Sequence, residues 1–399
     1  MIERNEYIST LIKLKDKDLI KVIMGIRRCG KSTILEIFKE YLMNNDIEKS
    51  QIIDINFEEA KYDFIDDHKK LYDFVNRKLI EGKKVYVFLD EVQKVKNFEK
   101  AVDSLYVNKN TDIYITGSNA FLLSGELATL LSGRYIKIEM QPFSFKEYVS
   151  AFSSEANTLK LFSEYQRFSS FPYAINFEND KKLVRNYLDG IFNSVVLKDV
   201  VSRHKISDVS MLESVIKYMA DNIGNICSIK KISDTMTSFG RKISTHTVEN
   251  YLNALVEAYA LYRVNRYDIK GKQHLKTGEK YYICDIGLRY YLLGENISDS
   301  GRALENIVYL ELIRRGCEVY VGKTDTLEVD FVAINENGTA YYQVSETVRG
   351  EEILNRELKS LDKIKDHNPK FLLTLDYDPP KSHNGIKQVN VIDWLLEEI

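Results

Sequence analysis

The stretch GIRRCGKS at residues 25–32 has the residue types and spacing of a loop that binds phosphate groups. It fits the pattern GxxxxGK[ST] at every fixed position, follows the apolar run LIKVIM and precedes a segment with helical periodicity. Glycines allow backbone N–H groups to curl around phosphate oxygens, and the N-terminus of the next helix carries a partial positive charge. The sequence therefore predicts a site for the phosphates of ATP. Its predicted binding residues here are Gly25, Arg28, Cys29, Gly30, Lys31, Ser32 and Thr33.

Two carboxylates supply the chemistry that such a loop needs. In VYVFLDEVQ, Asp90 and Glu91 directly follow an apolar run, so we expect both at the carboxyl end of a buried strand. Lys31 is expected to reach the β and γ phosphates, and Ser32 and Asp90 are expected to hold Mg²⁺. Glu91 is expected to orient and deprotonate the water that attacks the γ phosphate.

Three further polar residues are candidates for the same site. In DIYITGSN, Ser118 and Asn119 end a predicted strand, where they would contact the γ phosphate; a simple turn is the other interpretation. Arg134, in LLSGRYIKIEM, is a candidate for the arginine that neutralises transition-state charge, in its own chain or from a neighbouring subunit. The other interpretation of Arg134 is a solvated surface charge.

The stretch EVDFVAINENGTAYYQVSE at residues 328–346 resembles the metal-binding hairpin of a nuclease. Asp330 and Gln343 fill two of its positions, and Glu305 in the preceding helix matches a third acidic ligand. Ser345 stands where such a site needs a lysine to stabilise the charged transition state. We therefore expect a degenerate site without cleavage activity, although Lys323 on the neighbouring strand is a candidate replacement for the missing lysine.

Residues 211–290 have the order of a winged helix-turn-helix, which is three helices followed by two short strands. Between 211 and 280 there are eleven Lys/Arg against seven Asp/Glu, so this part is positive in a chain of net charge −3. Aromatic residues do not alternate with the basic ones, which favours double-stranded over single-stranded DNA. Packing or protein docking is the alternative role. The candidate DNA-binding residues are Thr245, Asn250, Arg263, Arg266, Lys270 and Lys272.

The elements that position these residues are those of an α/β protein. In the first third, short apolar runs alternate with helical patterns, which predicts a parallel sheet with helices on both faces. Helical and aromatic segments follow, then the winged-helix pattern, then a second α/β pattern of helix and strands. The predicted domains are a P-loop ATPase core at 1–141, a helical lid at 142–208, a winged helix-turn-helix at 209–295 and a small α/β domain at 296–399.

With these motifs the chain resembles the AAA+-type ATPases of archaea and bacteria that carry a C-terminal domain of unknown function. The resemblance lies in GIRRCGKST, FLDEVQ, TGSN, LSGRYIKIEMQPFSFKEY, KYYICDIGLRYYLLG and LENIVYLELIRRG, and extends over nearly the whole chain. It implies a P-loop NTPase of the additional-strand, catalytic-glutamate type, a winged helix and a terminal domain with restriction-endonuclease-like topology.

Composition and sequence patterns argue against a disordered, a secreted or a membrane-embedded protein. Apolar residues make up 44% and charged residues 29% of 399 residues, which is ordinary for a globular protein. The four cysteines show no CxxC spacing, which indicates a reducing compartment without structural zinc. No apolar run is long enough to span a bilayer, and the charged N-terminus lacks the core of a signal peptide. We therefore expect a cytoplasmic protein with no membrane partner.

The function that these motifs favour is an ATPase whose nucleotide state acts on a winged-helix, nuclease-like module that binds double-stranded DNA, with ATP and Mg²⁺ as cofactors. Two alternatives stay open: a regulatory switch or scaffold that holds ATP with little turnover, and an active ATP-regulated nuclease. Assembly as a homo-oligomer is also open, because a neighbouring copy would have to supply Arg134 in trans.

Overall fold

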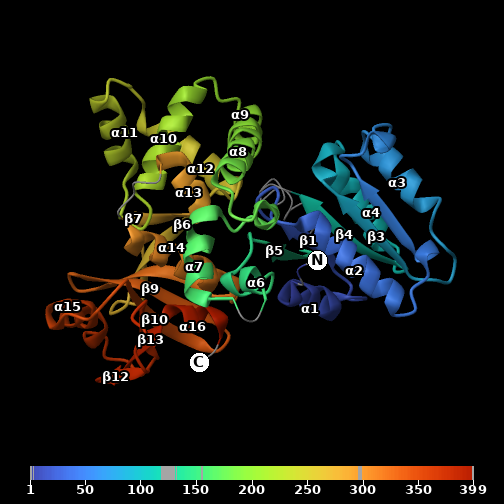
Figure 1. Ribbon diagram of the computed structural model, residues 1–399. Helices are drawn as coiled ribbons and strands as arrows, with labels where there is room; N and C mark the ends of the chain where they lie inside the picture. The colour runs from blue at the N-terminus through green and yellow to red at the C-terminus, as the bar shows by residue number, and fades with distance from the viewer. Residues whose placement is uncertain are drawn as a thin grey trace. The chain divides into compact units, whose positions relative to one another are not determined.

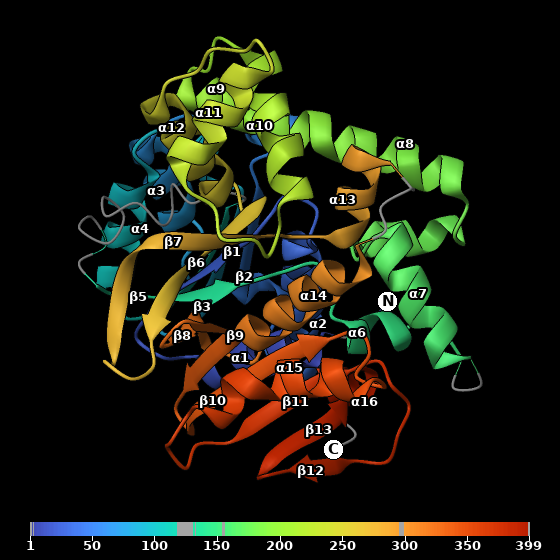
Figure 2. The same ribbon diagram turned by 90° about the vertical axis from the view of Figure 1, so that its left-hand side faces the viewer.

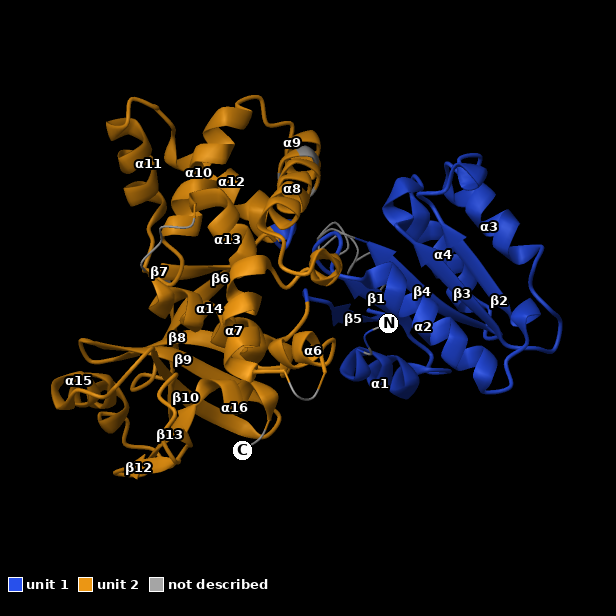
Figure 3. Ribbon diagram, in the orientation of Figure 1, with its two compact units in different colours: residues 1–142, 257–259 blue, residues 143–256, 260–399 orange. Residues whose placement is uncertain are grey.

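The computed structural model describes residues 2, 4–117, 131, 133–153, 156–294 and 299–397. The chain divides into two compact units (Figure 3). Unit 1 comprises Met1–Pro142 with Glu257–Tyr259, and unit 2 comprises Phe143–Val256 with Ala260–Ile399.

Unit 1 contains a parallel five-stranded sheet in the order β2-β3-β4-β1-β5 (Figure 1). Every residue of β1 and β3 is buried, whereas the edge strands β2 and β5 are partly exposed, as expected for continuous apolar runs in the centre of a parallel sheet. The predicted parallel sheet is thereby confirmed. Its strands are β1 (Ile20–Met24), β2 (Ile52–Asn56), β3 (Val85–Asp90), β4 (Thr111–Gly117) and β5 (Tyr135–Glu139).

The helices of unit 1 connect these strands and cover the sheet. The chain crosses from β1 to the edge strand β2 and then returns in the opposite direction through β3 to β4. Because such crossovers are right-handed, the two directions place the connecting helices on opposite faces of the sheet. Accordingly α1 packs with α2, and α3 packs with α4 on the other side of the sheet (Figure 1). The helices are α1 (Asn5–Leu14), α2 (Lys31–Asn44), α3 (His68–Asn76) and α4 (Phe98–Val107), with short 3₁₀ turns η1 (Lys49–Gln51), η2 (Ala60–Tyr62) and η3 (Val92–Lys94).

Unit 2 contains a mixed eight-stranded sheet in the order β12-β13-β11-β10-β9-β8-β6-β7 (Figure 2). The two strands predicted for the wing, β6 and β7, continue the sheet of the C-terminal module, because Arg266 of β6 lies opposite Val321 of β8. The strands are β6 (Leu261–Asp268), β7 (Gln273–Ile283), β8 (Glu318–Thr324), β9 (Leu327–Asn335), β10 (Gly338–Ser345), β11 (Lys370–Thr374), β12 (Lys381–His383) and β13 (Ile386–Asn390).

Helices cover both faces of the β9–β11 region. Neighbouring residues of a strand point to opposite faces, and on β10 Tyr341 packs in a core with Leu361 of α15, whereas Tyr342 lies beside Trp394 of α16. The helices are α6 (Phe145–Val149), α7 (Thr158–Phe168), α8 (Lys181–Ile191), α9 (Asp199–His204), α10 (Val209–Asp221), α11 (Ile229–Ser238), α12 (Thr245–Glu257), α13 (Ile286–Leu293), α14 (Ser300–Arg314), α15 (Glu351–Asp362) and α16 (Val391–Leu396), with 3₁₀ helix η5 (Pro172–Phe177) and π-helix η6 (Phe192–Lys198).

The motif CDIGLR at residues 284–289 has a packing role in unit 2. Asp285 caps α13 by accepting a hydrogen bond from the Leu288 N–H, and it also accepts hydrogen bonds from the N–H and hydroxyl of Ser170 at 2.6 Å each. A Cβ on Gly287 would lie 2.5 Å from the backbone nitrogen of Ser169, so only glycine allows this close approach. The motif therefore joins α13 to the segment that follows α7.

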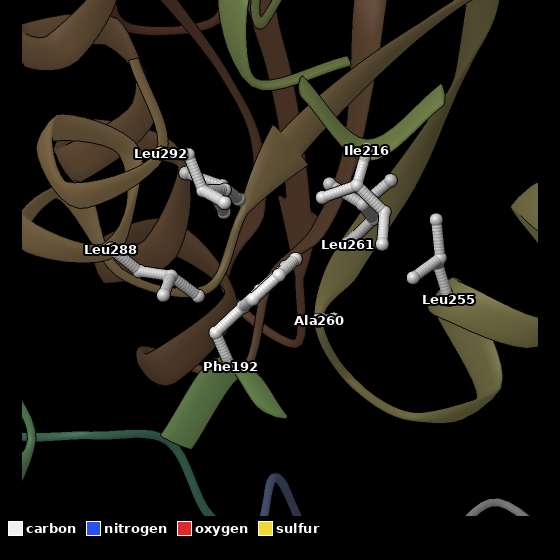
Figure 4. Close-up of a pocket in the computed structure, with 8 residues that line it drawn as sticks. Phe192, Ile216, Leu255, Ala260, Leu261, Leu288 and Leu292 are labelled. Carbon is white, nitrogen blue, oxygen red and sulfur yellow. The ribbon is translucent and has the colours of Figure 1, made fainter. Parts of the chain in front are cut away.

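A small cavity near α13 is lined by apolar side chains, among them Phe192, Leu261 and Leu288 (Figure 4). Because ligand sites need a few polar groups to orient the ligand, this cavity is a packing defect of the core.

In the described part of the chain, no helix is both long and apolar enough to cross a bilayer.

Candidate functional site

The loop between β1 and α2 has the backbone geometry that the sequence predicts for phosphate binding. Gly30 is the N-cap of α2 in the left-handed conformation, with φ of 101°, and Arg28 also has a positive φ of 67°. Gly25 has a φ of 148°, and a Cβ there would lie 1.9 Å from the carbonyl oxygen of Met140. The loop can therefore curl at the N-terminus of a 14-residue helix, where backbone N–H groups favour anions.

Lys31 lies on the inner side of this loop. Its ammonium group donates hydrogen bonds to the carbonyl oxygens of Gly25 at 3.0 Å and Ile26 at 3.2 Å, and the residue is buried. Arg28, Ser32 and Thr33 are exposed. The lysine is thus held within the curl, and the neighbouring polar residues are accessible to a ligand.

Cys29 is fully buried beneath the loop, and its burial raises the pKa of the thiol, so the thiol is protonated near neutral pH. The guanidinium of Arg4 donates to the Cys29 carbonyl oxygen at 2.8 Å and to the Gln141 carbonyl oxygen at 2.9 Å. Arg4 therefore fixes the phosphate-binding loop from the N-terminal segment. Its sequence signal is weak, because a single arginine before the first helix has no characteristic spacing.

Asp90 and Glu91 lie together at the carboxyl end of β3, and Thr116 of β4 connects them. The hydroxyl of Thr116 donates a hydrogen bond to Asp90 Oδ1, and Thr116 Oγ1 accepts one from the Glu91 N–H at 3.0 Å. The register that pairs Leu89 with Ile115 places these residues side by side. Thr116 was not predicted as a site residue, because its place beside the two acids depends on this strand register, which no local pattern in the sequence shows.

The donor set fits a magnesium ion. Asp90 is buried, and desolvation raises the pKa of its carboxyl, while hydrogen bonds from Thr116 and Ser32 oppose that shift. The contact between Ser32 and Asp90 brings together the hydroxyl and the carboxylate that the sequence predicts as metal ligands. Mg²⁺ is usually held by one or two such protein oxygens together with phosphate oxygens and water.

Glu91 has a backbone that few non-glycine residues adopt. Its φ is 54° and its ψ is 44°, and the residue is buried. The Gln93 side-chain amide donates a hydrogen bond to Glu91 Oε2. This conformation holds the carboxylate beside Asp90, and Gln93 orients it.

Arg134 lies where the strands of the sheet begin, whereas the phosphate-binding loop lies where they end. Its carbonyl oxygen accepts a hydrogen bond from Ile20 at the start of β1, whereas the loop follows Met24 at the end of that strand. At about 3.3 Å per residue this separation is roughly 15 Å. Arg134 pairs instead with Asp103 at 3.0 Å and lies over the ring of Tyr106. The structure therefore does not bring Arg134 to the site of its own chain, and Ser118 and Asn119 lie outside the described residues.

In unit 2 the predicted nuclease-like residues do come together. The Asp330 N–H donates to Gln343 Oε1 at 3.4 Å, and Asp330 Oδ2 accepts from the Val344 N–H at 2.8 Å. Glu305 of α14 joins them through an ammonium group that belongs to Lys280 of β7. The sequence offered Lys323 as a candidate for a lysine at this position, whereas in the structure Lys280 lies there. The hydroxyl of Ser345 donates to the Thr347 carbonyl oxygen, 3.0 Å away.

The candidate DNA-binding residues differ in exposure. Thr245 and Asn250 are exposed on α12, and Lys270 and Lys272 are exposed at the turn between β6 and β7. The guanidinium of Arg263 contacts Asn253, Glu279 and the ring of Tyr281. The Nε of Arg266 is buried. The two arginines therefore lie against their own fold, whereas Lys272 is exposed and the exposed Lys270 lies 3.5 Å from Asp325.

Comparisons with known proteins agree with the α/β fold of unit 1. Residues 17–149 match a family model described as an AAA domain, and residues 159–299 match a model described as a domain of unknown function. The Walker-type ATPase PABY2304 of Pyrococcus abyssi is similar in fold, with a TM-score of 0.52 and 16% identity over 73% of this chain and 96% of that chain. The parallel sheet, its phosphate-binding loop and these two matches therefore identify the class of fold, which is that of a P-loop ATPase with an AAA domain.

Two relatives match most of the chain. A protein of Haemophilus influenzae is 41% identical over 401 residues, which cover 100% of this chain and 99% of the relative. The protein MJ1544 of Methanocaldococcus jannaschii is 34% identical over 368 residues, which cover 87% of this chain and 79% of the relative. The chain belongs to the family of these two proteins.

Proposed function

We propose that the protein binds ATP with Mg²⁺ at the loop of residues 25–33 and hydrolyses it. The observation that carries this proposal is the cluster at the carboxyl edge of the unit 1 sheet, where Thr116 joins Asp90 to Glu91 and Ser32 contacts Asp90. Lys31 lies in the adjoining loop. This set would supply an anion site, a pair of metal ligands and a carboxylate base, which are the groups that phosphoryl transfer to water requires.

Each group has a separate task. Lys31 and the N-terminus of α2 would bind the β and γ phosphates, and Ser32 and Asp90 would hold Mg²⁺, which neutralises charge on the phosphate oxygens when bound. Glu91 would accept a proton from water as the water oxygen bonds to the γ phosphorus. The bond from that phosphorus to the bridging oxygen of the β phosphate then breaks, and ADP and inorganic phosphate are released.

The first prediction concerns nucleotide affinity. Lys31→Ala removes an ammonium group whose charge-assisted hydrogen bonds to phosphate are worth about 1.5–3 kcal/mol, so ATP affinity is expected to fall by roughly 10-fold to 150-fold. Titration calorimetry with ATP and MgCl₂ measures this change. Lys13→Ala removes an exposed lysine of α1 and serves as the control, with wild-type affinity expected. Equal affinity of wild type and Lys31→Ala would refute the proposed site.

A switch with slow turnover is the second candidate for unit 1. The observation that favours it is the hydrogen bond from Gln93 to Glu91, because the Gln93 amide occupies a carboxylate oxygen that would otherwise contact the attacking water. Tight co-purification of ATP with negligible release of phosphate would support the switch.

We further propose that unit 2 contacts double-stranded DNA. The support is the exposure of Thr245 and Asn250 on α12, the helix that follows α11 in helix-turn-helix order, and of Lys270 and Lys272 on the β6–β7 turn. A helix with exposed polar residues suits a groove, and exposed lysines on a turn suit phosphates. Arg263 and Arg266 are left out of this proposal because their guanidinium groups lie against the fold.

The second prediction tests this surface. Lys270→Ala/Lys272→Ala is expected to weaken binding to a labelled duplex and to reduce the slope of log affinity against log salt by about 2, since each phosphate contact contributes about 1. Fluorescence anisotropy at several salt concentrations measures both quantities. The matched control is Lys363→Ala/Lys365→Ala, two exposed lysines after α15. Identical slopes for the two double variants would remove DNA from the proposal.

A further inference from the structure

Lys280 of β7 is a buried lysine surrounded by carboxylates. Its ammonium nitrogen lies 2.9 Å from Glu305 Oε1, 2.7 Å from Glu328 Oε1 and 4.0 Å from Asp330 Oδ1, and its side chain is 3% exposed. Glu305 Oε1 also accepts a hydrogen bond from the hydroxyl of Tyr282 at 2.5 Å. Three carboxylates from α14 and β9 thus converge on one positive charge.

The buried carboxylates of this cluster need a positive charge close by. The side chains of Glu305 and Asp330 are 13% and 12% exposed, so an unpaired negative charge buried at this place would be costly. Burial and the charge of Glu305 raise the pKa of Asp330, and Lys280 opposes that effect. Lys280 is in turn stabilised as an ammonium by the carboxylates around it, which raise its pKa against the effect of burial. Lysine and carboxylates are therefore mutually dependent.

The ammonium group lies where a divalent metal ion would have to bind. A divalent metal held by Glu305 and Asp330 would lie about 2.0–2.6 Å from an oxygen of each side chain. The Nζ of Lys280 already lies between these oxygens. Two further oxygens of the predicted site are also engaged, since Asp330 Oδ2 accepts from the Val344 N–H and Gln343 Oε1 accepts from the Asp330 N–H. Among the described residues, no group of three or more His, Cys, Asp or Glu is arranged to hold a metal ion.

We propose that Lys280 is the resident cation of this cluster, occupying the place of a divalent metal and closing the nuclease-like site to it. The cluster then acts as an internal charged cross-link that joins β7 to α14 and to β9, although β6 and β8 separate β7 from β9 in the sheet. This inference concerns unit 2 alone and does not depend on ATP hydrolysis or DNA binding. It predicts that the site becomes a metal site when the ammonium is removed.

The test compares Mn²⁺ binding by nucleotide-free wild type, Lys280→Ser and Lys280→Ser/Asp330→Asn, measured by electron paramagnetic resonance of free Mn²⁺. Lys280→Ser is expected to bind about one Mn²⁺ per chain more than wild type, because the freed carboxylates are hard oxygen ligands. The double variant is expected to lose that ion. Any Mn²⁺ held by Ser32 and Asp90 is common to all three proteins and cancels.

Three results would overturn the proposal that Lys280 closes the site to a metal. One is Mn²⁺ binding by wild type that Asp330→Asn abolishes, and another is no gain by folded Lys280→Ser. Cleavage of plasmid DNA by wild type with Mg²⁺ or Mn²⁺ that Asp330→Ala abolishes would do the same, because an open metal site would then exist.

A double-mutant cycle covers the case in which Lys280→Ser does not fold. Lys280→Met should lower the urea midpoint of unit 2, and Lys280→Met/Glu305→Gln should recover part of that loss, because removing one carboxylate partly restores the charge balance. Trp394, the single tryptophan of the sequence, lies in unit 2 and reports its unfolding by fluorescence. A double variant whose loss equals the sum of the two single losses would show that Lys280 and Glu305 are not coupled and would refute the cross-link.

Discussion

Replacing Glu91 by glutamine is expected to lower the turnover number for ATP hydrolysis by about 10²–10⁴-fold, the contribution of a positioned general base. Glutamine keeps the size of the side chain but cannot take a proton from water. ATP affinity should stay close to that of wild type, because Lys31 and the loop are unchanged. Phosphate release under saturating ATP and MgCl₂ measures turnover, and calorimetry measures affinity.

Glu81→Gln is the matched control for this experiment, since Glu81 is an exposed glutamate of unit 1 outside the site. Its turnover should equal that of wild type. Equal turnover of wild type and Glu91→Gln would defeat the assignment of Glu91 as the base. If both proteins bind ATP tightly and release negligible phosphate, the switch with slow turnover is the correct function.

Gly25→Ala is expected to destabilise unit 1 by about 3–5 kcal/mol and to abolish measurable ATP binding. The new Cβ would lie 1.9 Å from the carbonyl oxygen of Met140, and this backbone atom cannot rotate away. Either Met140 or the loop must shift, and a shift of the loop displaces Lys31 from its place. Hydrogen–deuterium exchange of the β1 and β4 amides measures the free energy of opening of unit 1 separately from unit 2.

Gly82→Ala separates the steric effect from the cost of a positive φ. Gly82 has a φ of 75°, and a Cβ there would meet no atom within 4 Å. This control should cost about 1–2 kcal/mol from backbone strain and leave ATP binding intact. If Gly25→Ala is no more destabilising than Gly82→Ala, the close approach to Met140 does not constrain the loop.

Local sequence patterns were sufficient for the strands of unit 1. The apolar runs at β1, β3 and β4 are buried on both faces, so continuous hydrophobicity and the alternation with helices identify the parallel sheet. The pattern of the phosphate-binding loop is equally local, because its glycines and lysine are within eight residues.

The wing illustrates where local patterns fail. Two strands after three helices predict a separate hairpin, yet β6 is paired with β8 and forms one sheet with the C-terminal module. Arg263 and Arg266 were predicted from charge and from their place in the expected wing, yet Arg263 contacts Asn253 of α12 and the Nε of Arg266 is buried. Charge counted along a segment does not show which side chains extend into solvent.

By itself the sequence determined the phosphate-binding loop, the acidic pair Asp90 and Glu91 and the parallel α/β core, because each depends on residues close together in the chain. Only the tertiary structure placed Thr116 between the two acids, Arg134 where the strands of the sheet begin and Lys280 among three carboxylates. These contacts join residues that are distant in the chain, and strand register and helix packing decide which of them meet.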